Sequence, residues 1–567
     1  MKIARLRRLV AGMLLAAAPG LARGAAPDGD HVIELPPMLV SDAHGRQWRH
    51  AEIPGFEVLS LCPDDTTRDF LEDYHRLRRL LELVLPPELQ VSLSVPAVQI
   101  LCGRDVRQED AVTDMFRHGP GTALLQRFRV LPNLQLEDED AYTLFALLDQ
   151  DDPQADGPKP PRELALTREF VAFLLQRRVP ALPAWFVAGL TRLYGSLHYE
   201  DTAVELDPLG GWISPEENQT LAVNSGKKEA TQLVAAGLLP MEELLIAPRI
   251  PSGPATAEAA EKYRRAWIAQ AELFVRWALD GRSPEDRRAF FKFVDRASRE
   301  PVTAAMFQDS FGANFEQMRS RLVPYLRRAL TDAVTLRDSD ADDSIPIGLR
   351  AATPAEIARL KGGWERLETG FIKDAYPALA ETYREEARRT LRLSYELGDR
   401  DPRLLAEMGL CECDAGNDAA AQPLLTAAVQ AGVARPRAYE ELARIIYAQA
   451  RARPAGPKGG LGPEQIAAVV GPLLAGRRQA PPLPAAAGIF ADIWFHTEET
   501  PLPSDLVVLN EAARCFPRDL NLNYRVALLD ARAGVWPAAR QLVVHGLANA
   551  SDEANQARFA QLQRLLP

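Results

Sequence analysis

The chain has 567 residues, of which 47% are hydrophobic and 25% charged, a composition typical of folded globular domains rather than of disordered or fibrous proteins. Its formal net charge of −11 disfavours a protein whose main task is to hold nucleic acid or an anionic membrane. At roughly 100 to 200 residues per domain, the length predicts about three units, each with its own core.

Residues 1–25 have the pattern of a secretory signal peptide. Lys2 and three arginines precede an apolar stretch from Leu9 to Ala18, and small residues follow around Gly24. The apolar stretch is too short to span a bilayer, and no later window reaches the roughly 20 apolar residues that a transmembrane helix needs. We therefore expect an exported protein without a transmembrane segment, located in a bacterial periplasm.

Residues 30–150 predict a small α+β module. Apolar residues at helical spacing predict a helix from Thr66 to Val84. Short alternating runs typical of strands occur at 32–40, 56–62, 98–102, 124–130 and 142–148. The acidic run at 137–140 is either a carboxylate site or a solvated hairpin connection, and the second interpretation is favoured.

Two of the predicted strands end at Cys62 and Cys102. In an oxidising compartment these cysteines could form a bridge between neighbouring strands, but two buried free thiols are the favoured interpretation. With five cysteines in the chain, at least one thiol stays free.

A polar, proline-rich break at 151–161 separates this module from residues 162–335. There, apolar residues recur mainly three and four positions apart, which predicts a helical domain with one irregular excursion at 198–224. A second, acidic break at 338–344 predicts a solvated linker.

Two stretches of this helical domain, TREFVA (167–172) and AWFVAGLTRLY (184–194), resemble the core of the gluzincin metallopeptidases. More narrowly, they are similar to the peptidase MA-like family of exported bacterial proteins. In that family, one helix carries two histidines four residues apart with a glutamate after the first, and a second helix opens with Pro-x-Trp-x-x-Glu-Gly-Leu-Ala. The resemblance implies a zinc ion bound by the two histidines and the second-helix glutamate, with the first glutamate polarising a bound water.

The residues that would bind zinc are replaced in this chain. The resemblance assigns Arg168 and Ala172 to the two histidine positions and Ala188 to the third ligand, whereas Glu169 is retained at the general-base position. Arg168 would put a permanent cation where Zn²⁺ should bind. Without a metal no bound water is acidified, so we expect no catalytic residue, no metal and no cofactor.

Other interpretations of these residues stay open. The stretch 168–172 could be an amphipathic surface helix unrelated to peptidases. A metal site could have been rebuilt elsewhere, although no histidine among the candidate ligands has a second histidine three or four residues away; these candidates are His75, His118, His198, Glu200 and Asp201.

Residues 353–567 predict an all-α array of tetratricopeptide-like repeats. Leu405 and Gly409 recur 34 residues later as Tyr439 and Ala443, which is the period of that repeat. Gly416 falls at the expected turn between the two helices of one repeat. A looser copy lies near the C-terminus, and stacked helix pairs of this kind form an extended surface suited to peptide segments.

The predicted fold is therefore an α+β module and a helical zincin-like domain followed by tetratricopeptide-like repeats. The predicted function is that of an exported, non-catalytic pseudo-metallopeptidase whose array binds a protein or peptide. Trp185, Phe186 and Tyr194 are candidate binding residues at the wall of an old substrate groove, although core packing is the favoured interpretation. The alternative function is an active periplasmic hydrolase or peptidase with an unorthodox or rebuilt site.

Overall fold

The computed structural model describes residues 47–91, 93–103, 133–148, 165–200, 203–209, 238–246, 257–280, 284–337, 345–375, 377–456, 459–497 and 499–567. The predicted signal peptide, the strands at 32–40 and 124–130, and both polar breaks lie outside these ranges. Among the described helices, none combines the length and the apolar character that crossing a bilayer requires.

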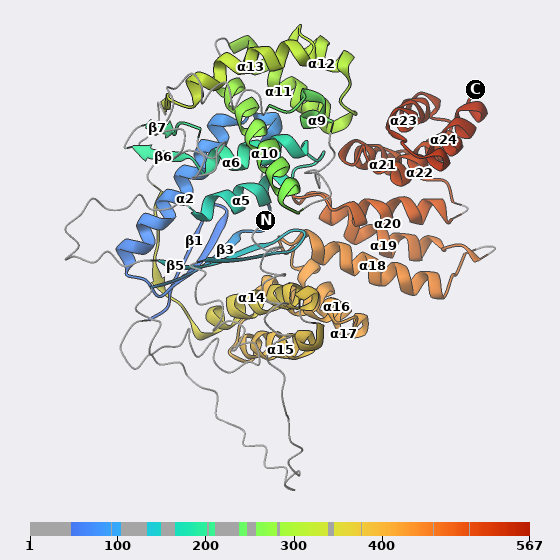
Figure 1. Cartoon of the computed structure of the whole chain (residues 1–567). Coiled ribbons are helices and arrows are strands. Elements are labelled where there is room, and N and C mark those ends of the chain that lie inside the picture. The colour runs from blue at the N-terminus through green and yellow to red at the C-terminus, as the bar shows by residue number, and fades with distance from the viewer. Residues whose placement is uncertain are drawn as a thin grey trace, which may run out of the picture.

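A six-stranded mixed sheet with the order β4-β5-β3-β2-β1-β9 organises the N-terminal part of the chain (Figure 1). Its strands are β1 (Arg49–Ile53), β2 (Phe56–Ser60), β3 (Ala97–Gly103), β4 (Asn133–Glu137), β5 (Tyr142–Leu148) and β9 (Arg350–Ala351). The pairs β2–β3 and β3–β5 are parallel, whereas β1, β4 and β9 run antiparallel to their neighbours. The predicted strands at 56–62, 98–102 and 142–148 are confirmed as β2, β3 and β5.

One face of the sheet packs against α2 (Asp64–Val84) and α5 (Ala165–Gln176) through aromatic side chains. Phe56 of β2 contacts Tyr74 of α2 and Phe170 of α5, with ring centroids 5.1 and 5.4 Å apart. The helix predicted from Thr66 to Val84 is thereby confirmed as α2, which begins two residues earlier.

The opposite face of the sheet is covered by α14 (Pro354–Ala375), the first helix of the C-terminal region. Leu360, Trp364 and Leu367, which share one face of α14, pack on Leu59 and Ile100 of the sheet. Because successive residues of a strand point to opposite faces, β2 directs Phe56 and Val58 to the aromatic side and Glu57 and Leu59 to α14. The sheet therefore lies between two helical layers that are far apart in the sequence.

The predicted helical domain continues above the aromatic face in the view of Figure 1. Its helices are α6 (Ala184–Tyr194), α9 (Met241–Leu245), α10 (Ala257–Leu279), α11 (Pro284–Arg299), α12 (Ala304–Phe311) and α13 (Phe315–Ala329). A small antiparallel sheet lies beside them, formed by β6 (Leu197–Glu200), β7 (Ala203–Leu206) and β8 (Val334–Arg337). Part of the irregular excursion predicted at 198–224 is thus a β-hairpin.

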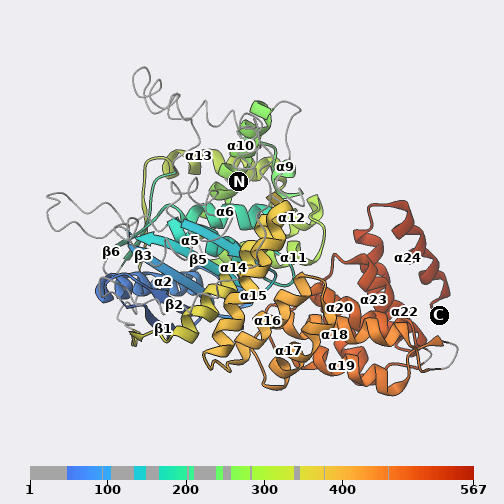
Figure 2. The same cartoon turned by 90° about the horizontal axis from the view of Figure 1, so that it is seen from below.

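Beyond α14, the chain forms a row of helix pairs that extends away from the sheet (Figures 1 and 2). These helices are α15 (Ala380–Glu396), α16 (Pro402–Asp414), α17 (Asp418–Gln430), α18 (Pro436–Ala452), α19 (Pro463–Gly476), α20 (Pro484–Phe495), α21 (Pro503–Cys515), α22 (Leu520–Arg532), α23 (Trp536–Asn549) and α24 (Glu553–Leu565). The α+β module and the helical array of the prediction are confirmed at this level.

Small residues set the close approach of the paired helices. A Cβ atom on Gly409 of α16 would lie 2.7 Å from the Leu425 side chain of α17, and one on Gly362 of α14 would lie 2.6 Å from Leu391 of α15. Gly416, in the connection between α16 and α17, has a φ of 75°, which glycine adopts without steric cost. Gly362 and Gly409 are therefore explained by helix packing, and Gly416 by its backbone conformation.

Candidate functional site

The two helices of the peptidase-like stretch, α5 and α6, lie side by side in the core. Arg168, at the first histidine position, is exposed, and its guanidinium group lies so close to Gly195 that a side chain there would overlap with it. Arg168, Arg192 and Arg276 all act electrostatically on Glu272 of α10, a buried carboxylate that Arg192 Nε contacts at 2.6 Å. The positive charge around Glu272, close to the first histidine position, is therefore supplied by arginine side chains.

Burial raises the pKa of Glu272, and these three arginines oppose that shift. Glu169, at the general-base position, is exposed on α5. Ala172 and Ala188 are half-buried and carry no atom that could bind a metal. The four positions thus offer a single metal-binding group, the carboxylate of Glu169.

Gly189, which follows Ala188 in α6, has a packing role of its own. A Cβ atom on Gly189 would lie 2.5 Å from the carbonyl oxygen of Ala271 on α10, so α6 and α10 can cross this closely because residue 189 is glycine. The position that the resemblance aligns with the family's glycine is therefore glycine for a packing reason, whereas its neighbour, Ala188, carries no carboxylate.

The aromatic candidates of α6 lie in the core. Trp185 and Phe186 have no exposed surface, and Tyr194 is 2% exposed. Trp185 contacts Phe274 of α10 and Phe293 of α11, with ring centroids 5.3 and 6.0 Å apart. Side chains with almost no accessible surface cannot contact a ligand from solution in this structure, so these three residues pack the core and do not form a binding surface.

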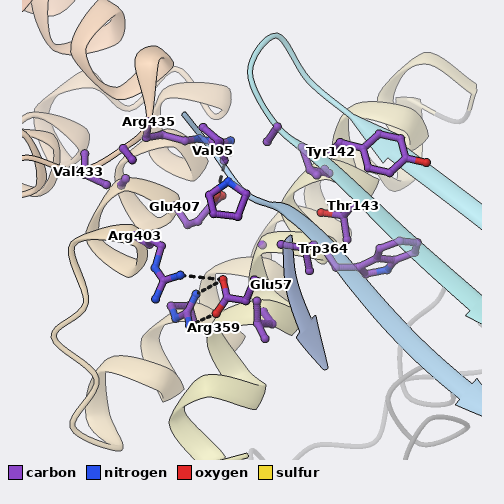
Figure 3. A pocket seen from close by; sticks show the side chains of 18 residues that line it. Glu57, Val95, Tyr142, Thr143, Arg359, Trp364, Arg403, Glu407, Val433 and Arg435 are labelled. Carbon is purple, nitrogen blue, oxygen red and sulfur yellow. Dashed lines mark hydrogen bonds and ion pairs between the residues drawn. The ribbon is translucent and has the colours of Figure 1, made fainter. Parts of the chain in front are cut away.

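Among the described residues, buried charged side chains are concentrated instead between the sheet and the helical array. Figure 3 shows one part of this interface. Glu57 of β2 is 3% exposed and receives hydrogen bonds from Arg359 of α14 at 2.6 Å and Arg403 of α16 at 3.0 Å. His50 of β1 lies 3.0 Å from the same carboxylate. Burial alone would raise the pKa of Glu57, but the hydrogen bond with His50 and the two guanidinium groups lower it to about 2.

A second charge cluster joins the β4–β5 connection to the array. Asp138 accepts hydrogen bonds from Arg366 of α14 at 2.6 Å, from Arg435 at 3.0 Å and from Arg437 of α18 at 3.3 Å. Burial opposes ionisation of Asp138, but these three arginines hold its pKa well below the usual range. Asp140 has no exposed surface and accepts a hydrogen bond from the backbone N–H of Arg437 at 2.7 Å.

The arginines of this cluster hold the array as well as the sheet. Arg366, with a side chain only 2% exposed, also donates to Glu407 and Asp414 of α16, at 2.5 and 3.0 Å. The prediction of a solvated connection at 137–140 is wrong in part: the segment does connect two antiparallel strands, and Glu137 and Glu139 are exposed, but Asp138 is half-buried and Asp140 is buried against the array. We call the Glu57 and Asp138 clusters together the sheet–array clamp.

Between the two clusters lies a cavity of about 60 Å³ (Figure 3). Its lining includes Glu57, Arg359, Arg403, Glu407 and Arg435, together with apolar side chains of the sheet. A volume of this size holds one or two waters rather than an organic substrate. Because each of these charged groups is already engaged with a partner of opposite sign, the clamp is suited to fixing the array in place.

One group of described residues has the composition of a possible metal site, namely His50, Glu52 and Glu57. Two guanidinium groups already neutralise Glu57, and Glu52 pairs with Arg403 at 3.0 Å. A divalent cation would have to displace these arginines, so the geometry does not fit a metal. Of the other candidate ligands, His75 lies on α2, whereas the side chains of His118, His198, Glu200 and Asp201 lie outside the described part of the chain.

No protein-family model matches this chain, and no characterised protein matches it either. The peptidase resemblance therefore rests on the two stretches of α5 and α6, and the repeat resemblance on the spacing within the array.

A larger cavity opens further along the array, where α18, α19, α20 and α21 meet. It has a volume of about 120 Å³ and mostly apolar walls, which include Tyr439, Leu483, Phe490 and Phe516. We call it the distal pocket. Neither this pocket nor the clamp was predicted from the sequence, because each is assembled from segments whose proximity only the fold creates.

The two cysteines at the ends of predicted strands, Cys62 and Cys102, are buried and form no disulfide in the structure. Burial, followed by the neighbouring Cys62 thiol, raises the pKa of Cys102 well above its usual range. Neither side chain reaches the clamp or the distal pocket.

Proposed function

We propose that this chain is an exported, non-catalytic protein with a peptidase-like middle region, and that its helical array binds a protein or peptide segment. The carrying observation is that the clamp fixes the first helices of the array to the sheet, while the distal pocket further along the array has no segment of the described chain in it. A surface held rigidly by one part of a protein binds a partner with less loss of conformational entropy.

The peptidase-like part of the proposal is supported by what is kept and what is lost. Gly189 keeps the close crossing of α6 and α10, whereas Arg168, Ala172 and Ala188 stand where the family has its zinc ligands. If zinc chemistry were under selection, the zinc ligands would be expected to persist at least as well as a glycine that serves only packing.

The proposal predicts that the full chain binds short peptides and does not hydrolyse them. We would select a display library of random short peptides on the purified chain, and incubate the selected peptides with the chain in the presence and absence of a chelator. Reproducible enrichment without cleavage is the expected result. Chelator-sensitive cleavage that disappears in Glu169→Ala would establish the hydrolase alternative, and absence of any enriched peptide would overturn the binding role.

The peptidase-like geometry can be tested separately by restoring the ligands. A triple variant with Arg168→His, Ala172→His and Ala188→Glu should bind one zinc per chain if α5 and α6 have the family's arrangement. Elemental analysis after dialysis against trace zinc measures this, with the single variant Ala172→His as the control. A folded triple variant that binds no zinc would contradict the assignment.

A further inference from the structure

The distal pocket contains one polar feature that its apolar walls do not explain, the carboxyl group of Glu440 on α18. Glu440 is 7% exposed and lines the pocket, and its Oε2 atom has no hydrogen-bond partner among the described residues. Buried carboxylates are normally paired, because an unpaired one loses its hydration without compensation. Glu57, Asp138 and Asp140 of the clamp each lie within 3.3 Å of an arginine nitrogen, whereas Glu440 forms no ion pair with a described residue.

The charged groups near Glu440 are already committed or carry the same sign. Glu139 and Asp140 of the β4–β5 connection and Glu441 of α18 are negative, and Arg437 points to Asp138 and Asp414. At the pocket wall, Arg477 of α19 forms an ion pair with Glu511 of α21. The surroundings of Glu440 thus have an excess of negative charge and no free cation among the described residues.

We propose that the distal pocket takes a basic side chain, lysine or arginine, from a partner peptide, with its aliphatic part against the apolar walls and its cation on Glu440. This inference rests on the proposed peptide-binding function and names the chemistry of the partner. It is specific to a cation because a carboxylate repels an anion, and one carboxylate with apolar neighbours lacks the oxygen ligands that a divalent metal requires.

The size of the pocket fits one side chain. A cavity of about 120 Å³ is close to the roughly 150 Å³ that accommodates a benzene-sized molecule, so it excludes a whole cofactor or a folded element. Long basic side chains bury their methylene groups on apolar surface and keep their charge at the end, which matches apolar walls with one carboxyl group. The negative net charge of the chain also favours the approach of a basic partner.

Binding should be linked to loss of a proton from Glu440. Burial, followed by the negative charge of Glu139, raises the pKa of Glu440 to about 8, so the empty pocket holds a neutral carboxylic acid at neutral pH. A bound cation favours the carboxylate, and the proton is released. The affinity for a basic peptide should therefore rise as the pH increases from about 6 to 8 and level off above that.

The test compares peptide selections on the full chain and on its Glu440→Gln variant, using the same display library of random short peptides. Glu441→Gln is the matched control, because Glu441 adjoins Glu440 in the sequence but is already paired with Arg444 at 2.6 Å. We expect lysine or arginine at one fixed position in peptides selected on the parent and on Glu441→Gln, and loss of that preference on Glu440→Gln.

The best selected peptide is then compared with its norleucine counterpart by fluorescence anisotropy. The basic peptide should bind about tenfold or more tightly, and its advantage should grow with pH from 6 to 8. Titration of Asp140, whose pKa is about 7 and whose charge acts on Glu440, contributes to the same pH range, so the pH dependence is compared with that of Glu440→Gln, in which only the Asp140 contribution should remain. Iodoacetamide labelling of Cys515, which lines the pocket, should be slowed by the basic peptide in the parent chain.

The outcomes separate the two proposals. Enriched peptides without a basic preference, or with one that survives in Glu440→Gln, would overturn this inference and leave peptide binding intact. Self-association of the parent that is lost in Glu440→Gln, measured by sedimentation, would identify a second copy as the occupant and also overturn it. No enriched peptide at all would overturn both. The Cys515 labelling experiment uses the parent chain, so it tests whether the basic peptide occupies the distal pocket even if a variant fails to fold.

Discussion

The two faces of the central sheet are held by different physical forces. The face covered by α2 and α5 is aromatic and apolar, with Phe56, Tyr74 and Phe170 in mutual contact. The face covered by α14 has an apolar centre around Trp364, flanked by the buried ion pairs of Arg359 and Arg366. The first arrangement stabilises by burial alone and tolerates changes in geometry, whereas ion pairs demand specific partners.

The two faces should therefore respond differently to substitution and pH. The largest expected effect is on the charged face. Arg366→Met leaves Asp138, Glu407 and Asp414 without their shared partner, and loss of one member of a buried ion pair costs about 3–5 kcal/mol. Urea unfolding measures the loss, and limited proteolysis should show the array detaching first. Arg389→Met is the control, since Arg389 is 74% exposed and should change stability by less than about 1 kcal/mol.

On the aromatic face, Phe170→Ala should cost about 3–4 kcal/mol of the free energy of unfolding, because it removes a buried ring that contacts Phe56, Tyr74, Tyr142 and Phe173. This loss should be independent of pH between 7 and 3, whereas the loss in Arg366→Met should shrink once the carboxylates it leaves unpaired can be protonated. A pH dependence of equal size in both variants would contradict the proposed difference between the faces.

Acidification should act on the charged face first. The pKa of Glu57 is lowered to about 2 from an ordinary value of 4.5, so its stabilising contribution is fully present above about pH 4.5 and is lost as the pH falls towards 2. Thermal melts between pH 7 and pH 2.5 should show a falling melting temperature below about pH 4.5. In Glu57→Gln that dependence should weaken, and if it stayed unchanged another group would be responsible.

Within the array, Gly409→Ala should destabilise by about 1–3 kcal/mol, because the new Cβ would lie 2.7 Å from Leu425. Gly370→Ala is the matched control: Gly370 lies in α14, is exposed, and has no atom within 4 Å of the place that a Cβ would take. That control should be neutral or slightly stabilising, since alanine has the higher helix propensity. Thermal melts of both variants make the comparison.

The smallest expected effect is that of Glu368. Its contribution changes the stability with pH in the opposite direction from that of Glu57. Burial, followed by the nearby Glu365, raises the pKa of Glu368 on α14 to about 8. The folded chain therefore keeps this proton where the unfolded chain has lost it, and stability falls as the pH rises from about 4.5 to 8. Glu368→Gln should remove this penalty and stabilise the chain by roughly 1 kcal/mol at pH 8 and by less at pH 5. Equal stabilisation at both pH values would argue against a neutral Glu368.

The sequence by itself determined the local structure wherever a regular pattern repeats. Apolar spacing located α2, alternation located β2, β3 and β5, and the 34-residue recurrence located the paired helices around Gly409 and Gly416. These patterns are readable because a helix or strand that buries one face imposes its own period on the sequence. That Arg168, Ala172 and Ala188 are not zinc-ligand residue types is likewise readable from the sequence, whereas the peptidase resemblance that gives these positions meaning stays a prediction.

Only the tertiary structure decided which charges meet. Asp138 lies in a short acidic run that has the appearance of a solvated turn, and Arg366 is one of several arginines on α14 and α15; nothing local indicates that they pair across 228 positions. The same holds for Glu440, whose burial depends on four helices and on the β4–β5 connection. The pairing of buried charges leaves no periodic pattern in the sequence, because the segments that bury these charges and remove their hydration are distant in the sequence.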